Sequence, residues 1–159
     1  MKVTLITIGK LKEKYFSEAS AEYEKRLSKY CKLEVKALDA AKLPSDPSDS
    51  EISAALKEEA DKIRRALPSG CEIIPMCIEG KEISSEELSH KLEALKLHGV
   101  SHICFIIGGS YGIADDIKAL ASFRMSMSKM TFPHRLARVM LLEQLYRAFK
   151  ISEGGNYHK

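Results

Sequence analysis

The pattern of apolar and polar positions divides this chain into alternating strands and helices. Residues 3–8 are almost all β-branched or apolar and end at Gly9, which is typical of a buried strand. Residues 13–30 place apolar side chains three and four positions apart, which predicts an amphipathic helix. The same reasoning predicts further strands at residues 33–38, 71–78, 102–107 and 123–128. It predicts further helices at residues 51–67, 113–121 and 135–149, and one that follows Ser84 or Ser85 and runs to Leu97. Such alternation favours an α/β fold in one domain, residues 1–159, with a largely parallel sheet covered by helices on both faces.

Turn-forming residues mark the boundaries between these elements. Residues 44–50 are prolines and small polar residues, so they form a surface loop whose last residue, Ser50, is expected to cap the helix after it. Residues 79–81 predict a turn after the third strand, and Ser84 or Ser85 is expected to cap the next helix.

The last helix is apolar around almost its whole circumference, which indicates burial on more than one side. Its apolar residues are Leu136, Val139, Met140, Leu141, Leu142, Leu145, Tyr146 and Phe149. One side can face the core and another a partner, so we expect a homodimer seam here. The alternative is a central helix of a monomer.

Composition narrows the class of protein. Apolar residues make up 45% and charged residues 30% of the chain, as in ordinary globular proteins. The apolar start is too short for a signal peptide, and no window approaches a membrane span, so we expect a cytoplasmic protein. The cysteines form no C-x-x-C pair and the histidines show no ligand spacing, so no metal site is expected. Because a free cysteine behaves as a small hydrophobic residue, we expect the thiols to be buried and reduced. The cysteines are Cys31, Cys71, Cys77 and Cys104.

Positive charge is concentrated near the carboxyl end. Residues 123–159 contain seven basic and two acidic residues, whereas the whole chain carries a net charge of only +3. This distribution suits a polyanionic partner such as RNA. A solvated helix face with an exposed tail would give the same distribution.

Two loops follow predicted strands and offer a ligand site. Residues 108–112 form a glycine-rich loop after the strand at 102–107, and residues 131–134 read Thr-Phe-Pro-His. Loops at the carboxyl edge of a parallel sheet form such sites, and these two could hold an adenine through backbone groups and apolar walls. The glycine loop fits neither the P-loop nor the dinucleotide fingerprint, and there is no G-x-S-x-G motif. A glycine loop can also serve only to turn the chain.

Four segments together resemble the RlmH family of small SPOUT-class methyltransferases. They are FIIGGSYG at 105–112, SKMTFPH at 128–134, EQLYRAF at 143–149 and the final YHK at 157–159. The resemblance covers the whole chain. It implies a SPOUT fold with a C-terminal trefoil knot, an obligate homodimer and S-adenosyl-L-methionine as methyl donor. It also implies that the product is N3-methylpseudouridine in a stem-loop of 23S ribosomal RNA, formed on the assembled ribosome.

The resemblance also implies roles for individual residues. The expected cofactor-binding residues are Met76, Gly108, Gly109, Met127, Ser128, Lys129, Met130, Thr131 and Phe132. The expected catalytic residues are His158 as proton acceptor, Arg147 as an orienting group and Tyr157 as a stacking ring. Tyr111 departs from the family pattern, in which many members have an acidic residue.

Each of these roles has a structural alternative. His158 could be an incidental side chain of the tail, Arg147 could pair only with Glu143, and His134 could only cap the last helix. At the level of function, the alternatives are a non-catalytic RNA- or ribosome-binding dimer and an enzyme acting on another nucleotide-like ligand.

Overall fold

The computed structural model describes residues 1–154, which form a five-stranded sheet and five helices. Along the chain the elements are β1 (Lys2–Ile8), α1 (Lys14–Leu27), β2 (Lys32–Leu38), α2 (Asp49–Ala66), β3 (Glu72–Glu82), α3 (Ser85–Leu97), β4 (His102–Ile107), α4 (Asp115–Lys118), β5 (Met125–Ser126) and α5 (His134–Ser152). The strand order is β2-β1-β4-β3-β5, and every neighbouring pair is parallel. The predicted α/β class with a parallel sheet is therefore confirmed.

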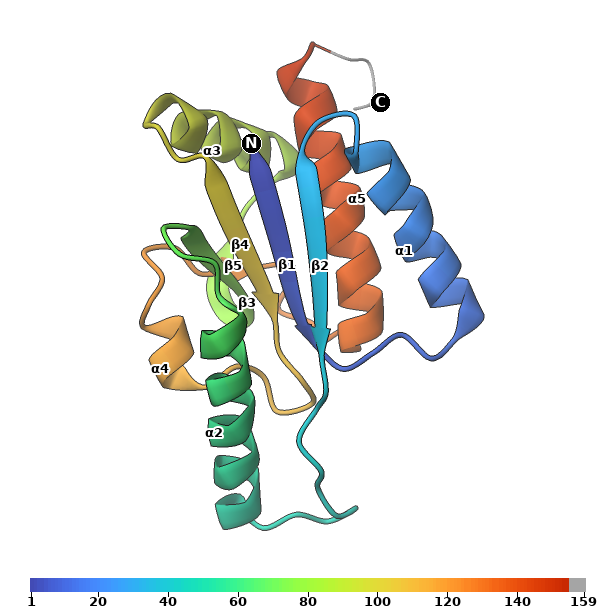
Figure 1. Ribbon diagram of the computed structural model, residues 1–159, viewed down its shortest axis with the longest axis vertical. Coiled ribbons are helices and arrows are strands. Elements are labelled where there is room, and N and C mark those ends of the chain that lie inside the picture. Colours follow the sequence, from blue (N-terminus) through green and yellow to red (C-terminus); the bar gives the residue numbers. More distant parts are fainter. Residues whose placement is uncertain (155–159) are drawn as a thin grey trace.

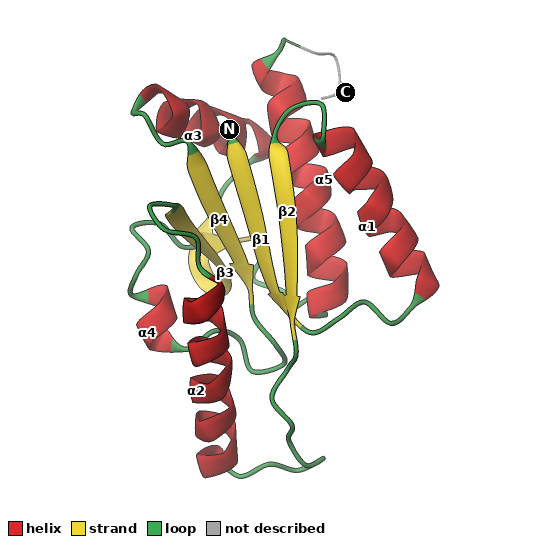
Figure 2. Cartoon of the chain, viewed as in Figure 1, coloured by secondary structure: helices red, strands yellow, loops and turns green. Residues whose placement is uncertain are grey.

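Helices cover both faces of the sheet (Figure 1). Helices α1, α3 and α5 lie on one face, with α5 packed between the other two, while α2 and α4 lie on the opposite face (Figure 2). Because α5 runs opposite to the strands, its first turn lies at their carboxyl ends and its last turn at the other end of the sheet. This arrangement decides which parts of α5 can take part in a site at the carboxyl edge.

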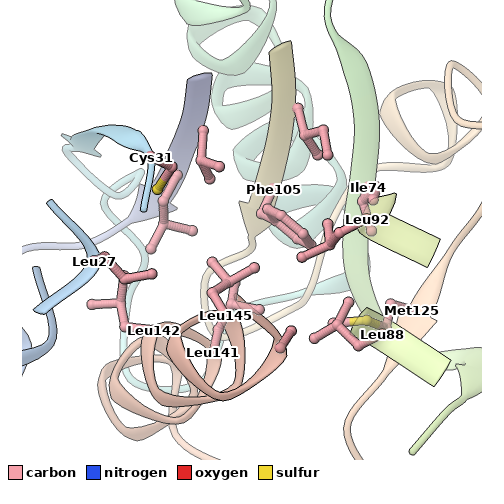
Figure 3. Packing of buried hydrophobic residues seen from close by; sticks show 14 of the residues in the cluster. Leu27, Cys31, Ile74, Leu88, Leu92, Phe105, Met125, Leu141, Leu142 and Leu145 are labelled. Atoms are coloured by element: carbon pink, nitrogen blue, oxygen red, sulfur yellow. The ribbon is translucent and has the colours of Figure 1, made fainter. Parts of the chain in front are cut away.

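The core is divided between the two faces because side chains alternate along each strand. In β4, Ile103 and Phe105 face α5, whereas Cys104 and Ile106 face α2 and α4. The apolar residues of α5 at Leu141, Leu142 and Leu145 point into the first cluster toward Phe105 and Leu27 (Figure 3). These three leucines are fully buried within the protomer, so they are not available to a partner.

The structure extends β3 beyond its expected end. The predicted turn at 79–81 is wrong, because the strand continues to Glu82 with an irregular register against β5. Gly80 makes this possible: a Cβ there would lie 2.7 Å from the backbone carbon of Met125. Glycine is therefore required at this position by the close approach of two backbones.

Helix α4 and strand β5 are both shorter than expected. The helix predicted at 113–121 is a single turn, α4, and the strand predicted at 123–128 is reduced to Met125–Ser126.

The cap of α2 is Ser48 and not Ser50: its hydroxyl accepts from the N–H of Glu51, whose carboxylate accepts from the N–H of Ser48. Ser84 forms the same reciprocal pair with Glu87 at the start of α3.

The thiols differ in their surroundings. Cys31 and Cys104 are buried, and burial raises their pKa values to about 11 and about 12, so both stay protonated at neutral pH. Cys71 and Cys77 are only half-buried. Among the helices of residues 1–154, none is both long and apolar enough to span a bilayer.

Candidate functional site

A cavity of about 830 Å³ opens at the carboxyl edge of the sheet. Its walls come from the middle of β3, the loop after β4, Lys118 of α4, and the stretch from Ser126 of β5 to Ala137 in the first turn of α5. The structure thus brings together segments that are separated along the chain. Eight of the nine residues expected to bind a cofactor line this cavity: Met76, Gly108, Gly109, Met127, Ser128, Met130, Thr131 and Phe132. Lys129 is exposed and is not part of the wall.

The glycine loop closes on itself at the floor of the cavity. Gly112 donates its N–H to the carbonyl of Gly109 at 3.1 Å, and Gly112 has a positive φ of 84°. A Cβ on Gly108 would lie 2.2 Å from the carbonyl oxygen of Gly112, and one on Gly109 would point toward Ile8 and Glu59. Gly108 is needed because the loop folds against its own backbone. Glycine also allows the backbone to lie close to a ligand, and that role of Gly108 and Gly109 stays a prediction.

The second wall consists of the segment between β5 and α5. Ser126 donates its hydroxyl to the carbonyl of Ser128 at 3.0 Å, and the Ser128 hydroxyl accepts from the N–H of Met130 at 3.0 Å. These side-chain bonds hold the segment in place without using regular secondary structure. Within residues 1–154, the N–H groups of Thr131 and Phe132 have no hydrogen-bond partner. Two backbone donors therefore stand beside the cavity and are able to bind a ligand.

His134 begins α5 and lines the cavity. Its ring lies against Gly9, where a Cβ would be only 2.8 Å from Nε2. Burial, and then the neighbouring charge of Arg135, lowers the pKa of His134, so its imidazole is neutral at pH 7. The Arg135 guanidinium is itself paired with the carboxylate of Glu13. A neutral histidine can donate one hydrogen bond and accept another.

A charged pair that the sequence analysis missed forms the outer wall. Lys118 of α4 bonds the carboxylate of Glu79 at 2.6 Å and that of Asp115 at 2.8 Å. The Lys118 ammonium holds the pKa of Glu79 below its usual range, mainly through this hydrogen bond. The spacing Asp115–Lys118 signals only a local helix pair, and nothing in the sequence indicates Glu79, which was expected in a turn.

Of the expected catalytic residues, Arg147 is the one that the structure describes, and it does not line this cavity. Arg147 donates to Glu143 at 3.0 Å and 2.6 Å, which is the pairing that its spacing offered as the alternative. Arg147 lies 13 residues beyond His134 along α5, a rise of about 20 Å. Tyr157 and His158 lie outside the described residues.

A second cavity, of about 640 Å³, lies on the face that carries α5. It is lined by the half-buried side of α5 at Val139, Met140 and Glu143, by Tyr23 of α1 and by the start of α3. Leu142 and Leu145 are buried in the core and do not line this cavity.

The fold and the position of the first cavity define a class of protein, the methyltransferases of the SPOUT type. Residues 1–158 match the family model described as "Predicted SPOUT methyltransferase". The fold is similar to that of the tRNA (m1G37) methyltransferase from Aquifex aeolicus, with a TM-score of 0.55 and 13% identity over 92% of this chain and 70% of that one.

Relatives of known name place the chain more narrowly. It is 48% identical to the ribosomal RNA large subunit methyltransferase H of Bifidobacterium adolescentis and 48% identical to that of Clostridium acetobutylicum, in both cases over the full length of both chains. The chain belongs to the SPOUT methyltransferase family, and within it to the ribosomal RNA large subunit methyltransferase H group.

Proposed function

We propose that this protein transfers a methyl group from S-adenosyl-L-methionine to N3 of a pseudouridine in a stem-loop of 23S ribosomal RNA, on the assembled ribosome. The observation that carries the proposal is the cavity between the glycine loop and the segment before α5. Its residues coincide with those that the family resemblance assigns to the cofactor. The chain would act as one SPOUT domain, whose C-terminal part is proposed to form the trefoil knot.

The residues present fit this cofactor. A volume of about 830 Å³ is within the range of small-molecule sites. Apolar side chains at Met76, Met127 and Phe132 offer walls for an adenine, and the N–H groups of Thr131 and Phe132 offer donors for its ring nitrogens or for a carboxylate. When bound, S-adenosyl-L-methionine supplies an already activated methyl group on a sulfonium. The protein therefore contributes mainly alignment and exclusion of water.

The acceptor nitrogen is an imide and must lose its proton before or during transfer. A positioned acceptor contributes about 10²–10⁴-fold. We propose His158 for this role, with Tyr157 stacking on a base and Arg147 orienting the base or a phosphate. His134 is the second candidate for proton acceptor, because it is neutral and lines the cavity.

Geometry favours a site shared between two protomers. Helix α5 rises about 22 Å from Ala137, which lines the cavity, to its last residue, Ser152. The six residues from Ser152 to His158 extend at most about 22 Å. To reach the cavity of its own protomer, the tail would have to run back fully extended along the whole of α5. A homodimer in which the tail of one protomer serves the cavity of the other would remove this difficulty.

The first experiment tests the reaction itself. Calorimetric titration with S-adenosyl-L-methionine should show binding, and incubation with ribosomes lacking the modification should transfer one methyl group to the large-subunit RNA. Binding without transfer to any ribosomal RNA would favour another nucleotide-like substrate. Neither binding nor transfer, with ribosomes present, would favour a non-catalytic ribosome-binding dimer.

The second experiment tests the shared site with mixed dimers. Deleting residues 156–159 should leave cofactor affinity nearly unchanged and lower transfer by at least about 10²-fold, and His158→Ala should reproduce much of that loss. A protomer without its tail, paired with a protomer carrying a defective cavity, should recover activity. A doubly defective protomer paired with a wild-type one should not. The reverse pattern would place each tail at its own cavity.

A further inference from the structure

Three exposed apolar side chains surround the mouth of the methyl-donor cavity. Among residues 1–154, few large apolar side chains are exposed, and three of them line this one cavity: Ile78 at 51%, Tyr111 at 46% and Met130 at 70% exposure. They come from three separate segments: Ile78 lies within β3, Tyr111 follows β4 and Met130 follows β5. Exposed apolar side chains that gather around the rim of one cavity favour a binding surface, because single exposed apolar residues are usually scattered.

Tyr111 occupies a fixed position on this rim. It is the third residue of the turn from Gly109 to Gly112, closed by the 3.1 Å hydrogen bond between the ends of that turn. Gly108 packs so closely on Gly112 that the base of the loop leaves no room for a side chain. The ring is therefore presented outward from a rigid support, which lowers the entropy lost when a flat ligand stacks on it.

The inner part of the cavity is suited to the methyl donor and the rim to the acceptor. Gly108 is buried and Met76 and Met127 are half-buried, whereas the rim residues are at the solvent side. Exposed cations lie beside the rim: Lys129 precedes Met130, and Arg124 donates to the carbonyl of Lys118 on the cavity wall. Cations next to an aromatic ring suit a nucleotide, with its phosphate and its flat base.

We propose that Tyr111, flanked by Ile78 and Met130, is a stacking platform that holds the unstacked nucleobase of the RNA substrate over the methyl donor. This inference rests on the proposed function and adds the residues that recognise the acceptor. A π-face stacks on any base, so the platform contributes affinity and alignment rather than sequence reading. Met130 adds a polarisable thioether beside the ring.

The test compares Tyr111→Ala and Tyr111→Phe with Tyr15→Ala, a matched control. Tyr15 is 65% exposed on α1 and does not line the cavity. Loss of one base–aromatic contact corresponds to a rise of about 5-fold to 150-fold in KM for unmodified ribosomes. Tyr111→Ala should show this rise, Tyr111→Phe should remain near wild type because the ring is kept, and Tyr15→Ala should be unchanged. Affinity for S-adenosyl-L-methionine and the dimer mass should be unchanged in all three.

Several outcomes would overturn the proposal. A wild-type KM for ribosomes in an active Tyr111→Ala enzyme removes the platform. Weakened cofactor affinity in Tyr111→Ala assigns the ring to the adenine of the donor, and a shift to monomers assigns it to the second copy. Failure of the wild-type protein to methylate ribosomes refutes the proposed function, and this inference with it, and is recognised because it appears without any substitution.

Discussion

Substitution of Gly108 by alanine tests how the cavity floor is built. The new Cβ would be 2.2 Å from the Gly112 carbonyl oxygen and 2.5 Å from its carbon, whereas real Cβ contacts essentially never fall below 3.0 Å. The backbone of the loop must therefore move by about 0.8 Å, the difference between 2.2 Å and 3.0 Å. Overpacking of this kind costs about 1–3 kcal/mol, because backbone cannot yield as a flexible side chain does.

The assay measures stability and ligand affinity on the same samples. Gly108→Ala should lose about 1–3 kcal/mol in urea unfolding and at least about tenfold in calorimetric affinity for S-adenosyl-L-methionine, because the loop that lines the cavity is displaced. Gly108→Val should be more severe on both measures. A loss of affinity without any loss of stability would instead support direct contact between Gly108 and the ligand.

Two neighbouring glycines serve as controls. Gly109→Ala meets the Ile8 methyl at 3.0 Å and the flexible Glu59 carboxylate at 3.2 Å, so its cost should stay within about 1 kcal/mol. Gly112→Ala meets nothing within 4 Å but has a φ of +84°, so it should show only backbone strain, about 1–2 kcal/mol. If Gly108→Ala binds and unfolds like Gly109→Ala, the closed-loop explanation is refuted.

Three further predictions concern the dimer, the substrate and pH. Val139→Arg and Met140→Arg on the outer side of α5 should give monomers in sedimentation. Leu97→Arg, at an 84% exposed position on α3, should remain dimeric. Unchanged dimers in all three variants would place the dimer interface elsewhere. Methyl transfer should be strong on whole ribosomes and poor on a naked stem-loop, and equal transfer to the naked stem-loop would contradict this prediction. Transfer should also fall by about tenfold or more as salt rises from about 50 to 200 mM, a loss for which two phosphate contacts suffice. Burial lowers the pKa values of His102 and His134, so below about pH 6.5 the unfolded chain binds protons that the folded chain does not. The free energy of unfolding should therefore fall as pH drops from 7.5 to 5.5. His134→Gln should flatten this decline in urea unfolding, and an unchanged slope would refute the role of His134 in it.

The hydrophobic pattern was sufficient for the sheet and the long helices. Runs such as residues 102–107 are apolar because both faces of a parallel strand are buried. The cap at Ser48 could also have been found, since Ser48 and Glu51 have the spacing of a capping box. The shortness of β5 could not, because its length depends on the register shift against β3 at Gly80.

The candidate site was predictable in its location but not in its details. Loops at the carboxyl ends of parallel strands must meet at one edge, so the meeting of the glycine loop with residues 127–132 followed from the topology. The ion pair of Glu79 and Lys118 did not, since it joins residues 39 positions apart through the unexpected extension of β3. The burial of Leu142 and Leu145 also required the structure, because a helix that is apolar all round does not show which side faces its own core.

The length of helix α5 fixes both the distance and the rotation between its two ends. The helix carries cavity residues on its first turn and leads into the tail after its last, and it contains no irregular turn between them. Each added or removed residue would shift one end relative to the other by about 1.5 Å and turn it by about 100°. A change of length is therefore far more disruptive here than a change of side chain. In a dimer whose tails serve opposite cavities, the same shift and rotation would arise at both sites at once. The length of α5 would then set the geometry of both sites.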